Sequence, residues 1–384
     1  MGSLSPHDPF LTLVPEAIGR LRSLYIYATP KYLQDITGHL SRPTPLLERL
    51  SVDTEHESKP VDRPILAPAL FDGDLSSLRR LRLQSVRMEL PWRNMVNLTS
   101  LALGCIEVSV RHLLDFFEGA PHLRVIELRS VIPTSDAQNG RLVSLTTLNK
   151  MGIYGSGPPS LLLDHLLIPA GAKLATMSSL RDLPAEANLP NFLDNLKNLP
   201  NFTKVNLRAD DFGSQLQFTG PNGEVSFGSV VPVTNVTCIV LESLIKFDTS
   251  NTKRLDIFRT NPPSRYLPYR ALLPMKNLHI FTLAQCKNPD AFIHALDPGL
   301  NSSNVVVCPK LEELALTLFP GWNVDTKNMI AVIAARALRG AKLRTLRITC
   351  KREELDPGAL LEFRKHVSHV EYSPEISVVE NGWK

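Results

Sequence analysis

The chain contains few cysteines, few aromatic residues and no strong excess of charge of either sign. Of its 384 residues, 5 are cysteine and 7% are aromatic, while 42 Lys and Arg stand against 38 Asp and Glu. The cysteines are odd in number, widely spaced and without a C-x-x-C pair, which argues against a disulfide framework and a zinc ribbon. The near balance of charge argues against a protein built mainly to bind nucleic acid or an acidic membrane.

Long apolar runs and targeting signals are also missing. No apolar run approaches the roughly 18 residues of a membrane-spanning helix. The first residues, MGSLSPHDPFLTLVPEAIGR, have neither the basic start nor the apolar core of a secretory signal. We therefore expect no membrane-spanning segment and a cytoplasmic or nuclear location.

Motifs for common catalytic and cofactor chemistry are absent as well. The chain has no G-x-x-x-x-G-K-[ST] phosphate loop, no G-x-S-x-G nucleophile elbow and no H-E-x-x-H metal pair. The glycine-rich residues 152–157, GIYGSG, have the order G-x-x-G-x-G and not that of a dinucleotide-binding turn. We therefore predict that the chain is not an enzyme and that it uses no catalytic residue, cofactor or metal.

Leucine, by contrast, is abundant, with 61 residues, and it recurs in a short pattern. The pattern is L-x-x-L-x-L, in which other apolar residues replace some leucines. Copies begin at residues 21, 47, 78, 98, 123, 148, 202, 236, 278, 311 and 343, with a weaker one at 367. The starts at 78, 98, 123 and 148 match the ~20–29-residue period of leucine-rich repeats. Each copy predicts a short strand that must stack on its neighbours to bury its apolar side chains.

Helix-period patterns fill many of the segments between these strands. Val110, Leu113, Leu114 and Phe117 have the i, i+3, i+4, i+7 spacing of one helix face. Similar patterns predict helices over 31–40, 192–199, 290–296, 328–339 and 359–366. The predicted fold class is therefore α/β, a leucine-rich-repeat solenoid with a curved parallel sheet and helices on its convex side. It is expected to cover 15–375, between an N-terminal segment 1–14 and a C-terminal tail 376–384.

The middle of the chain departs from this regularity. Residues 161–168 read as a helix and 173–177 as a strand. Two alternating apolar runs, 215–219 and 224–227, flank the turn sequence GPNG and predict a β-hairpin. The proline-rich residues 261–268 read as a loop, and a seam is predicted near 180–190.

The period also predicts which side chains face a partner. Residues that flank the second apolar position of each copy point away from the core, onto the concave face of the sheet. The candidate contacts are Tyr25, Arg49, Arg80, Arg82, Glu127, Lys204, Asn206, Glu313 and Arg347. This row is basic at both ends and small or apolar in its middle, which suits an extended protein partner better than a deep catalytic pocket.

A run of positive charge occurs over 327–352, where eight Lys and Arg occur without an acid. Its simplest interpretation is solvated helix and strand faces. A sharper one is a cationic patch for an acidic or phosphorylated peptide, which Arg79, Arg80, Arg82 and Arg87 could also form. RNA is a poorer candidate because aromatic residues do not interleave with the arginines.

Three stretches resemble the leucine-rich-repeat region of F-box-like proteins common in mushroom-forming fungi. They are NLTSLAL at 97–103 with LLDFF at 113–117 and APHLRVI at 120–126, then LLDHLLIPA at 162–170 and FTGPNG at 218–223. The likeness covers roughly 15–375. In that family an F-box docks on the adaptor of an SCF-type ubiquitin ligase and the repeats select the substrate. Residues 1–14 are too short for the helical F-box, so we expect none in this chain.

The sequence thus predicts a monomeric, non-catalytic protein-interaction module with a protein partner on its concave face. The resemblance implies substrate recognition for a ubiquitin ligase, with the SCF adaptor as a second partner. Two alternatives stay open. One is a leucine-rich-repeat scaffold unconnected to ubiquitin, and the other is an enzyme with a site in the irregular region 155–235.

The repeat register predicts the cost of truncating its core leucines. Leu101→Ala and Leu128→Ala should each lower the free energy of unfolding by roughly 2–5 kcal/mol, because each would leave a cavity in a packed core. Urea denaturation of each variant measures this difference. An unchanged midpoint in either variant would show that the register is wrong at that copy.

Overall fold

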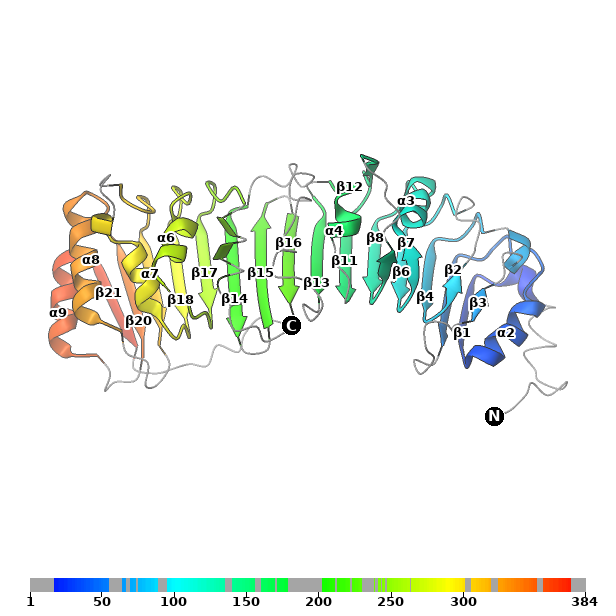
Figure 1. The fold of residues 1–384 in the computed structure, drawn as a ribbon, viewed down its shortest axis with the longest axis horizontal. Coiled ribbons are helices and arrows are strands. Elements are labelled where there is room, and N and C mark those ends of the chain that lie inside the picture. Colours follow the sequence, from blue (N-terminus) through cyan, green and yellow to red (C-terminus); the bar gives the residue numbers. More distant parts are fainter. Residues whose placement is uncertain are drawn as a thin grey trace. The chain divides into compact units, whose positions relative to one another are not determined.

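The structure is a computed structural model of the whole chain, which divides into two compact units, Met1–Leu199 and Pro200–Lys384 (Figure 1). We call them the N-terminal and C-terminal units. The described residues are 17–54, 64–66, 70–73, 75–88, 95–134, 140–155, 160–169, 171–178, 202–210, 213–221, 223–229, 238, 241–242, 244–245, 247–262, 264–300, 305–318, 324–350 and 355–373. The predicted segment 1–14, seam 180–190 and tail 376–384 lie outside them.

The N-terminal unit contains a sheet in which each adjacent pair of strands is parallel. In spatial order its strands are β1 (Ser23–Ala28), β2 (Arg49–Thr54), β4 (Arg80–Gln84), β6 (Ser100–Gly104), β8 (Val125–Arg129), β11 (Lys150–Gly155) and β13 (Lys173–Ser178). The first six begin two residues after the start of a leucine pattern, and β13 matches the strand expected over 173–177. These seven strand predictions are confirmed.

The C-terminal unit contains a mixed sheet that begins with three antiparallel strands. In spatial order its strands are β16 (Gly223–Ser229), β15 (Gly213–Gly220), β14 (Lys204–Asp210), β17 (Arg254–Phe258), β18 (Ile280–Ala284), β19 (Glu313–Thr317), β20 (Thr345–Thr349) and β21 (His369–Ser373). From β14 to β21 the pairing is parallel. The predicted hairpin is confirmed as β15 and β16.

One predicted strand is wrong. The copy starting at 236 was expected to form a strand over 236–241, but the described residues 238, 241–242 and 244–245 are helical. Leu241 and Leu244 are both buried, and their spacing of three is that of a helix face. The strand of this repeat is β17 instead, and the buried Thr252 occupies its first apolar position. A threonine there hides the pattern from a search for apolar residues.

The helices are α2 (Pro30–His39), α3 (Val110–Gly119), α4 (Ser160–Leu163), α6 (Tyr266–Leu272), α7 (Pro289–Ala295), α8 (Thr326–Leu338) and α9 (Pro357–His366). The helices expected over 31–40, 110–117, 290–296, 328–339 and 359–366 are confirmed, while 192–199 lies outside the described residues. Two expectations need correction, because α4 ends early and is followed by strand β12 (Leu166–Leu167), and α6 begins inside the predicted loop 261–268. Short strand pairs also join β3 (Ile65–Leu66) to β5 (Arg87–Met88), β7 (Glu107–Ser109) to β9 (Ile132–Thr134), and β10 (Val143–Ser144) to β12.

Local sequence signals account for where these helices begin. Proline occupies the first turn of α2, α7 and α9, where its missing N–H costs nothing. A polar side chain just before the helix accepts a backbone N–H in each of five cases. These caps are Thr29, Ser109, Asn288, Asp325 and Asp356. In the part of the chain that the structure describes, none of the helices is long and apolar enough to cross a bilayer.

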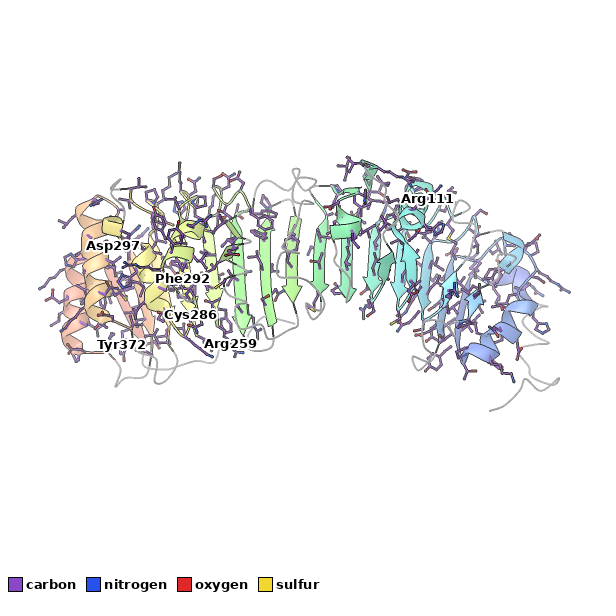
Figure 2. All side chains as sticks on the ribbon, in the orientation of Figure 1. Arg111, Arg259, Cys286, Phe292, Asp297 and Tyr372 are labelled. Carbon is purple, nitrogen blue, oxygen red and sulfur yellow. The ribbon has the colours of Figure 1, made fainter. Side chains whose placement is uncertain are left out.

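The core of each unit lies between one face of its sheet and the connecting segments. In the C-terminal unit α6, α7, α8 and α9 lie in a row across that face, each in contact with the next (Figure 1). Phe292 of α7 packs edge-on against Phe281 of β18, with ring centroids 6.2 Å apart (Figure 2). In β1, β4 and β17 buried and more exposed residues alternate. One face of each sheet is therefore apolar and covered, and the other is left for polar side chains.

The entrances and exits of the strands repeat the same backbone geometry. On entry, two successive N–H groups donate to one carbonyl of the preceding turn, as Glu48 and Arg49 do to Arg22 at 2.9 and 3.0 Å. On exit, a residue in the left-handed region donates to the last residue of the next strand. Ser85 does so with φ 56° and Cys105 with φ 51°, at 2.8 and 2.7 Å. Every strand of this kind thus depends on the next one for its backbone hydrogen bonds.

Gly155, the last residue of β11, lies against Ser130, the left-handed exit residue of the preceding strand β8. It has φ +153°, and a Cβ added there would lie 2.7 Å from the Cα of Ser130. Gly155→Ala should therefore destabilise the protein by about 1–3 kcal/mol in urea denaturation. The control is Gly38→Ala in helix α2, where an added Cβ meets no atom within 4 Å. That change should stabilise by up to about 1 kcal/mol, and equal effects of the two would contradict the close contact at Gly155.

Candidate functional site on the open face of the sheets

Alternate residues of each strand point to the side opposite the buried core, and we call this side the open face. In the N-terminal unit the strand register arranges them in three rows across the sheet. The first row is Ser23, Arg49, Arg80, Ser100, Val125, Lys150 and Lys173; the second is Tyr25, Ser51, Arg82, Ala102, Glu127, Gly152 and Ala175; the third is Tyr27, Asp53, Gln84, Gly104, Arg129, Tyr154 and Met177.

The open face of the N-terminal unit carries an excess of positive charge. Its three rows hold six cations and two acids, Asp53 and Glu127, which leaves a net +4. The first row holds four of the cations and no acid. Arg49 and Arg80 are direct register partners on β2 and β4, and both are exposed. Neither has an ion pair within the described residues, so these two arginines present their charge to solvent.

Glu127, Arg129 and Tyr154 form a connected group beside this row. The Arg129 guanidinium donates to Oε1 of Glu127 from Nε at 2.9 Å and from Nη2 at 2.5 Å, and it lies 5.9 Å from the centroid of the Tyr154 ring. The hydrogen bond that Arg129 donates to Glu127 raises the pKa of the Arg129 guanidinium. A Cβ added to Gly152 would lie 2.5 Å from the Tyr154 ring, so the ring lies over this glycine. The group is therefore held in place by its own contacts.

A hollow lies over β6 in the same open face. Its empty volume is about 340 Å³, part of which is open to solvent. Its outward-facing lining residues are Arg82, Gln84, Ala102, Gly104, Glu127 and Arg129. The Arg82 guanidinium donates to Oε1 of Gln84 at 3.3 Å. Ala102 and Gly104 of β6 form the floor, and the four long polar side chains form the walls.

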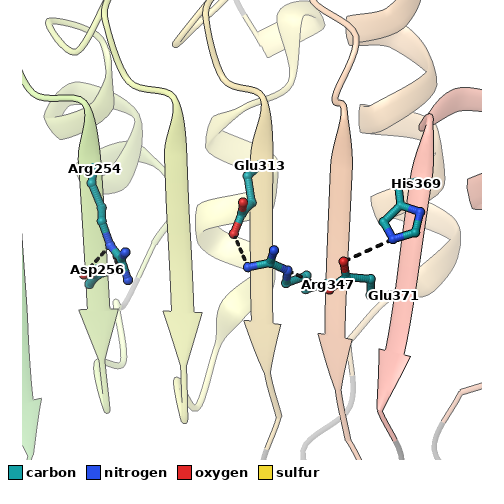
Figure 3. A network of polar contacts seen from close by, with 6 residues as sticks. All are labelled: Arg254, Asp256, Glu313, Arg347, His369 and Glu371. Carbon is teal, nitrogen blue, oxygen red and sulfur yellow. Dashed lines mark hydrogen bonds and ion pairs between the residues drawn. The ribbon is translucent and has the colours of Figure 1, made fainter. Parts of the chain in front are cut away.

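The C-terminal unit has an open face of a different kind, because its charges pair with one another (Figure 3). Arg347 lies between Glu313 and Glu371, at 2.7 Å from each, and His369 Nε2 lies 3.1 Å from Glu371. Asp256 similarly receives Arg254 at 2.9 Å and Lys204 at 3.4 Å. The expectation of a basic C-terminal end was therefore wrong, since Arg347 is neutralised by two acids from neighbouring strands.

All nine predicted contact residues lie on the open face, five in the N-terminal unit and four in the C-terminal unit. They differ in availability. Tyr25 is 66% exposed, whereas Asn206 is 7% exposed and donates to Gln217 Oε1 at 2.9 Å. Asn206 is therefore part of the packed sheet and not a contact residue, because its side chain is held against that of Gln217, its register partner on β15. Lys204, Glu313 and Arg347 are held in ion pairs.

Sequence reasoning missed several residues of the same surface. It considered two outward positions per strand, and the third outward position holds Tyr27, Arg129 and Tyr154. Extending each predicted strand by two residues, to the next outward position, would have included them. Arg254 and Asp256 were missed for the separate reason that Thr252 hides their repeat.

The basic stretch 327–352 does not form one patch within the described residues. Arg336 is 1% exposed, and its guanidinium donates to the carbonyls of Val307 at 2.6 Å and Cys308 at 2.9 Å. Arg347 is ion-paired, and Lys351 and Arg352 lie outside the described residues. Arg336 is therefore a core residue, and its hydrogen bonds join α8 to the segment before β19.

The described residues contain no group of three or more His, Cys, Asp or Glu side chains that could hold a metal ion. No protein-family model matches the chain. No curated protein matches it either. The candidate site is thus defined by the geometry and charge of the open face.

Cys308 beside Arg336 gives a pH dependence of stability. Burial raises the pKa of its thiol from 9.0 to about 12, an effect that Arg336 opposes. The unfolded chain therefore loses this proton at lower pH than the folded chain. Stability from this group is complete below pH ~9 and is lost as the pH rises towards ~12, by up to about 4 kcal/mol. Urea denaturation should show a shallower alkaline decline for Cys308→Ala than for wild type, and parallel declines would contradict the assignment.

Proposed function

We propose that the chain is a non-catalytic leucine-rich-repeat solenoid that binds an acidic segment of a partner protein on the open face of its N-terminal unit. Support for the repeats comes from the recurring leucine pattern together with the repeated entry and exit hydrogen bonds of the strands. Within the described residues, a sheet with one covered face and one open face offers a broad surface for a partner. Such surfaces suit extended protein partners.

The observation that carries the proposal is the first row of the N-terminal open face. Arg49 and Arg80 lie on adjacent strands, Lys150 and Lys173 lie on another adjacent pair, and the row contains no acid. A single exposed ion pair contributes only about 0–1 kcal/mol. Several cations gathered on one face, without an acid in their row, instead raise the association rate of an oppositely charged partner and select its orientation.

The C-terminal unit serves as an internal comparison. Its open-face side chains among the described residues include four cations and four acids, and ion pairs join most of them. An acidic partner would have to displace the existing acids there. The N-terminal unit has no such competition around Arg49 and Arg80, which favours it as the docking surface.

The second part of the proposal is that the bound partner is a substrate for an SCF-type ubiquitin ligase, which rests on the resemblance of three sequence stretches to fungal F-box-like proteins. We place the chain in the cytoplasm or nucleus as a monomer, with the ligase adaptor as a second partner. The test is co-purification of the adaptor and cullin with the tagged chain from native extract. If proteins co-purify without them, the function is that of a scaffold unconnected to ubiquitin.

The enzyme alternative receives no support from the described part of 155–235. Asp164 and His165 are neighbours there, and burial raises the pKa of the Asp164 carboxyl. His165 Nδ1, however, lies 2.9 Å from the carbonyl of Arg141, so this nitrogen is engaged with the backbone. An adjacent Asp–His pair without a nucleophile or an enclosed cleft does not make a catalytic site.

Charge reversal tests the docking surface. Arg49→Glu with Arg80→Glu should reduce recovery of the binding partners from native extract at least tenfold, because the partner's acids would meet like charge. The matched control is Lys31→Glu with Lys327→Glu, which changes the net charge equally at exposed positions of α2 and α8. The control should recover the partners as wild type does. Equal recovery by both double variants, with unchanged thermal unfolding, would refute the proposal.

A further inference from the structure

We propose that the hollow over β6 is the anchor pocket of this surface and that it accepts one carboxylate side chain of the partner, which rests on the function proposed above. The surface as a whole supplies attraction at a distance. The hollow supplies a place where one side chain of the partner can be surrounded on several sides, and a few well-packed contacts carry most of the energy of protein interfaces. It would therefore set which acidic segments bind.

The shape of the hollow follows from residue size along neighbouring strands. Ala102 and Gly104 of β6 form the floor, while the adjacent strands β4 and β8 carry long side chains in the same two rows. Strands are about 4.8 Å apart, so the two walls stand roughly 10 Å apart at their base. This distance separates the strand backbones, and the Gln84 side chain reaches over part of the floor, so the space left admits no more than one side chain. An added Cβ at Gly104 would lie 3.3 Å from the Gln84 side chain, so the floor tolerates little enlargement.

The charges of the walls favour a monoanion. Arg82 and Arg129 contribute two positive charges and Glu127 one negative charge, which leaves +1 around the hollow. Arg129 is already bound to Glu127 through two of its nitrogens, whereas the Arg82 guanidinium donates to the neutral Gln84 and has further N–H groups to offer. A carboxylate matches the +1 and can accept from Arg82. A phosphate dianion carries more negative charge than the +1 of the hollow can balance. Glu127 would also repel it more strongly than it repels a carboxylate.

The first row places further cations on both sides of the hollow. Arg49 and Arg80 lie on β2 and β4, and Lys150 and Lys173 lie on β11 and β13. From β2 to β13 there are five strand steps, or about 24 Å, which an extended peptide of about seven residues spans. The preferred ligand is therefore an extended acidic segment with one carboxylate seated in the hollow and others near its ends. Single-stranded RNA fits less well, because Arg129 already lies beside the Tyr154 ring.

The test fills the hollow without changing its charge. The probe is a fluorescein-labelled decapeptide of alternating glutamate and serine, titrated with the full-length chain and followed by fluorescence anisotropy. Ala102→Leu places an apolar side chain on the floor and should weaken binding at least tenfold. The matched control is Ala315→Leu on β19, an outward alanine on the open face of the C-terminal unit, and it should change binding less than twofold. Thermal unfolding checks that both variants fold, since both side chains are only half-buried.

The outcomes separate this inference from the proposed function. If Arg49→Glu with Arg80→Glu abolishes peptide binding while Ala102→Leu binds as wild type does, the surface is real and the anchor pocket is not. If the wild-type chain does not bind the peptide, the pocket inference fails, and the partner recovery measured in extract still decides the proposed function. Tighter binding of a phosphoserine decapeptide, or of a single-stranded RNA decamer, would overturn the choice of a carboxylate. A glutamine–serine decapeptide should not bind.

Discussion

The structure depends on one constraint, which is that a five- or six-residue strand cannot satisfy its own backbone or bury its own apolar face. Each strand of the parallel regions obtains both from its neighbours. Two N–H groups at its entrance share one carbonyl of the preceding turn, and a left-handed residue at its exit reaches the following strand. The leucines can be buried only when these hydrogen bonds align the strands in register. Backbone pairing and core packing therefore stabilise the same arrangement.

This constraint leaves the open face free to vary. Side chains on that face contribute little to the core, so their charges are not dictated by folding. In the C-terminal unit the charged side chains form ion pairs with one another, as around Arg347 and Asp256. In the N-terminal unit Arg49 and Arg80 stand next to each other without an acid in their row. Exposed like charges on adjacent strands are mildly unfavourable for folding, so folding does not account for their placement.

Arg336 shows why a run of basic residues in the sequence need not form a basic surface in the structure. It belongs to the longest run of basic residues free of acids, yet it is 1% exposed and bound by backbone carbonyls. Burial lowers its pKa, in line with the cost of enclosing a guanidinium without a carboxylate. Such a residue is retained where it satisfies several carbonyls at once. Of the second basic region of the sequence, Arg80 and Arg82 lie exposed on one face of the sheet, whereas the described part of 327–352 does not form one patch.

The sequence by itself determined most strands of the two large sheets, most helices and the direction of the strand side chains. The leucine period places β1, β2, β4, β6, β8 and β11, because alternation along a strand is a local property. It failed where a residue of another type took a repeat position, as Thr252 did before β17. Tertiary structure alone decided which outward residues are available. The ion pairs of Arg347 join residues 34 and 24 positions away, and Asn206 is buried beside Gln217 of the hairpin. The hollow over β6 exists only because register brings long side chains beside Ala102 and Gly104, and register is a relation between strands that no single repeat contains.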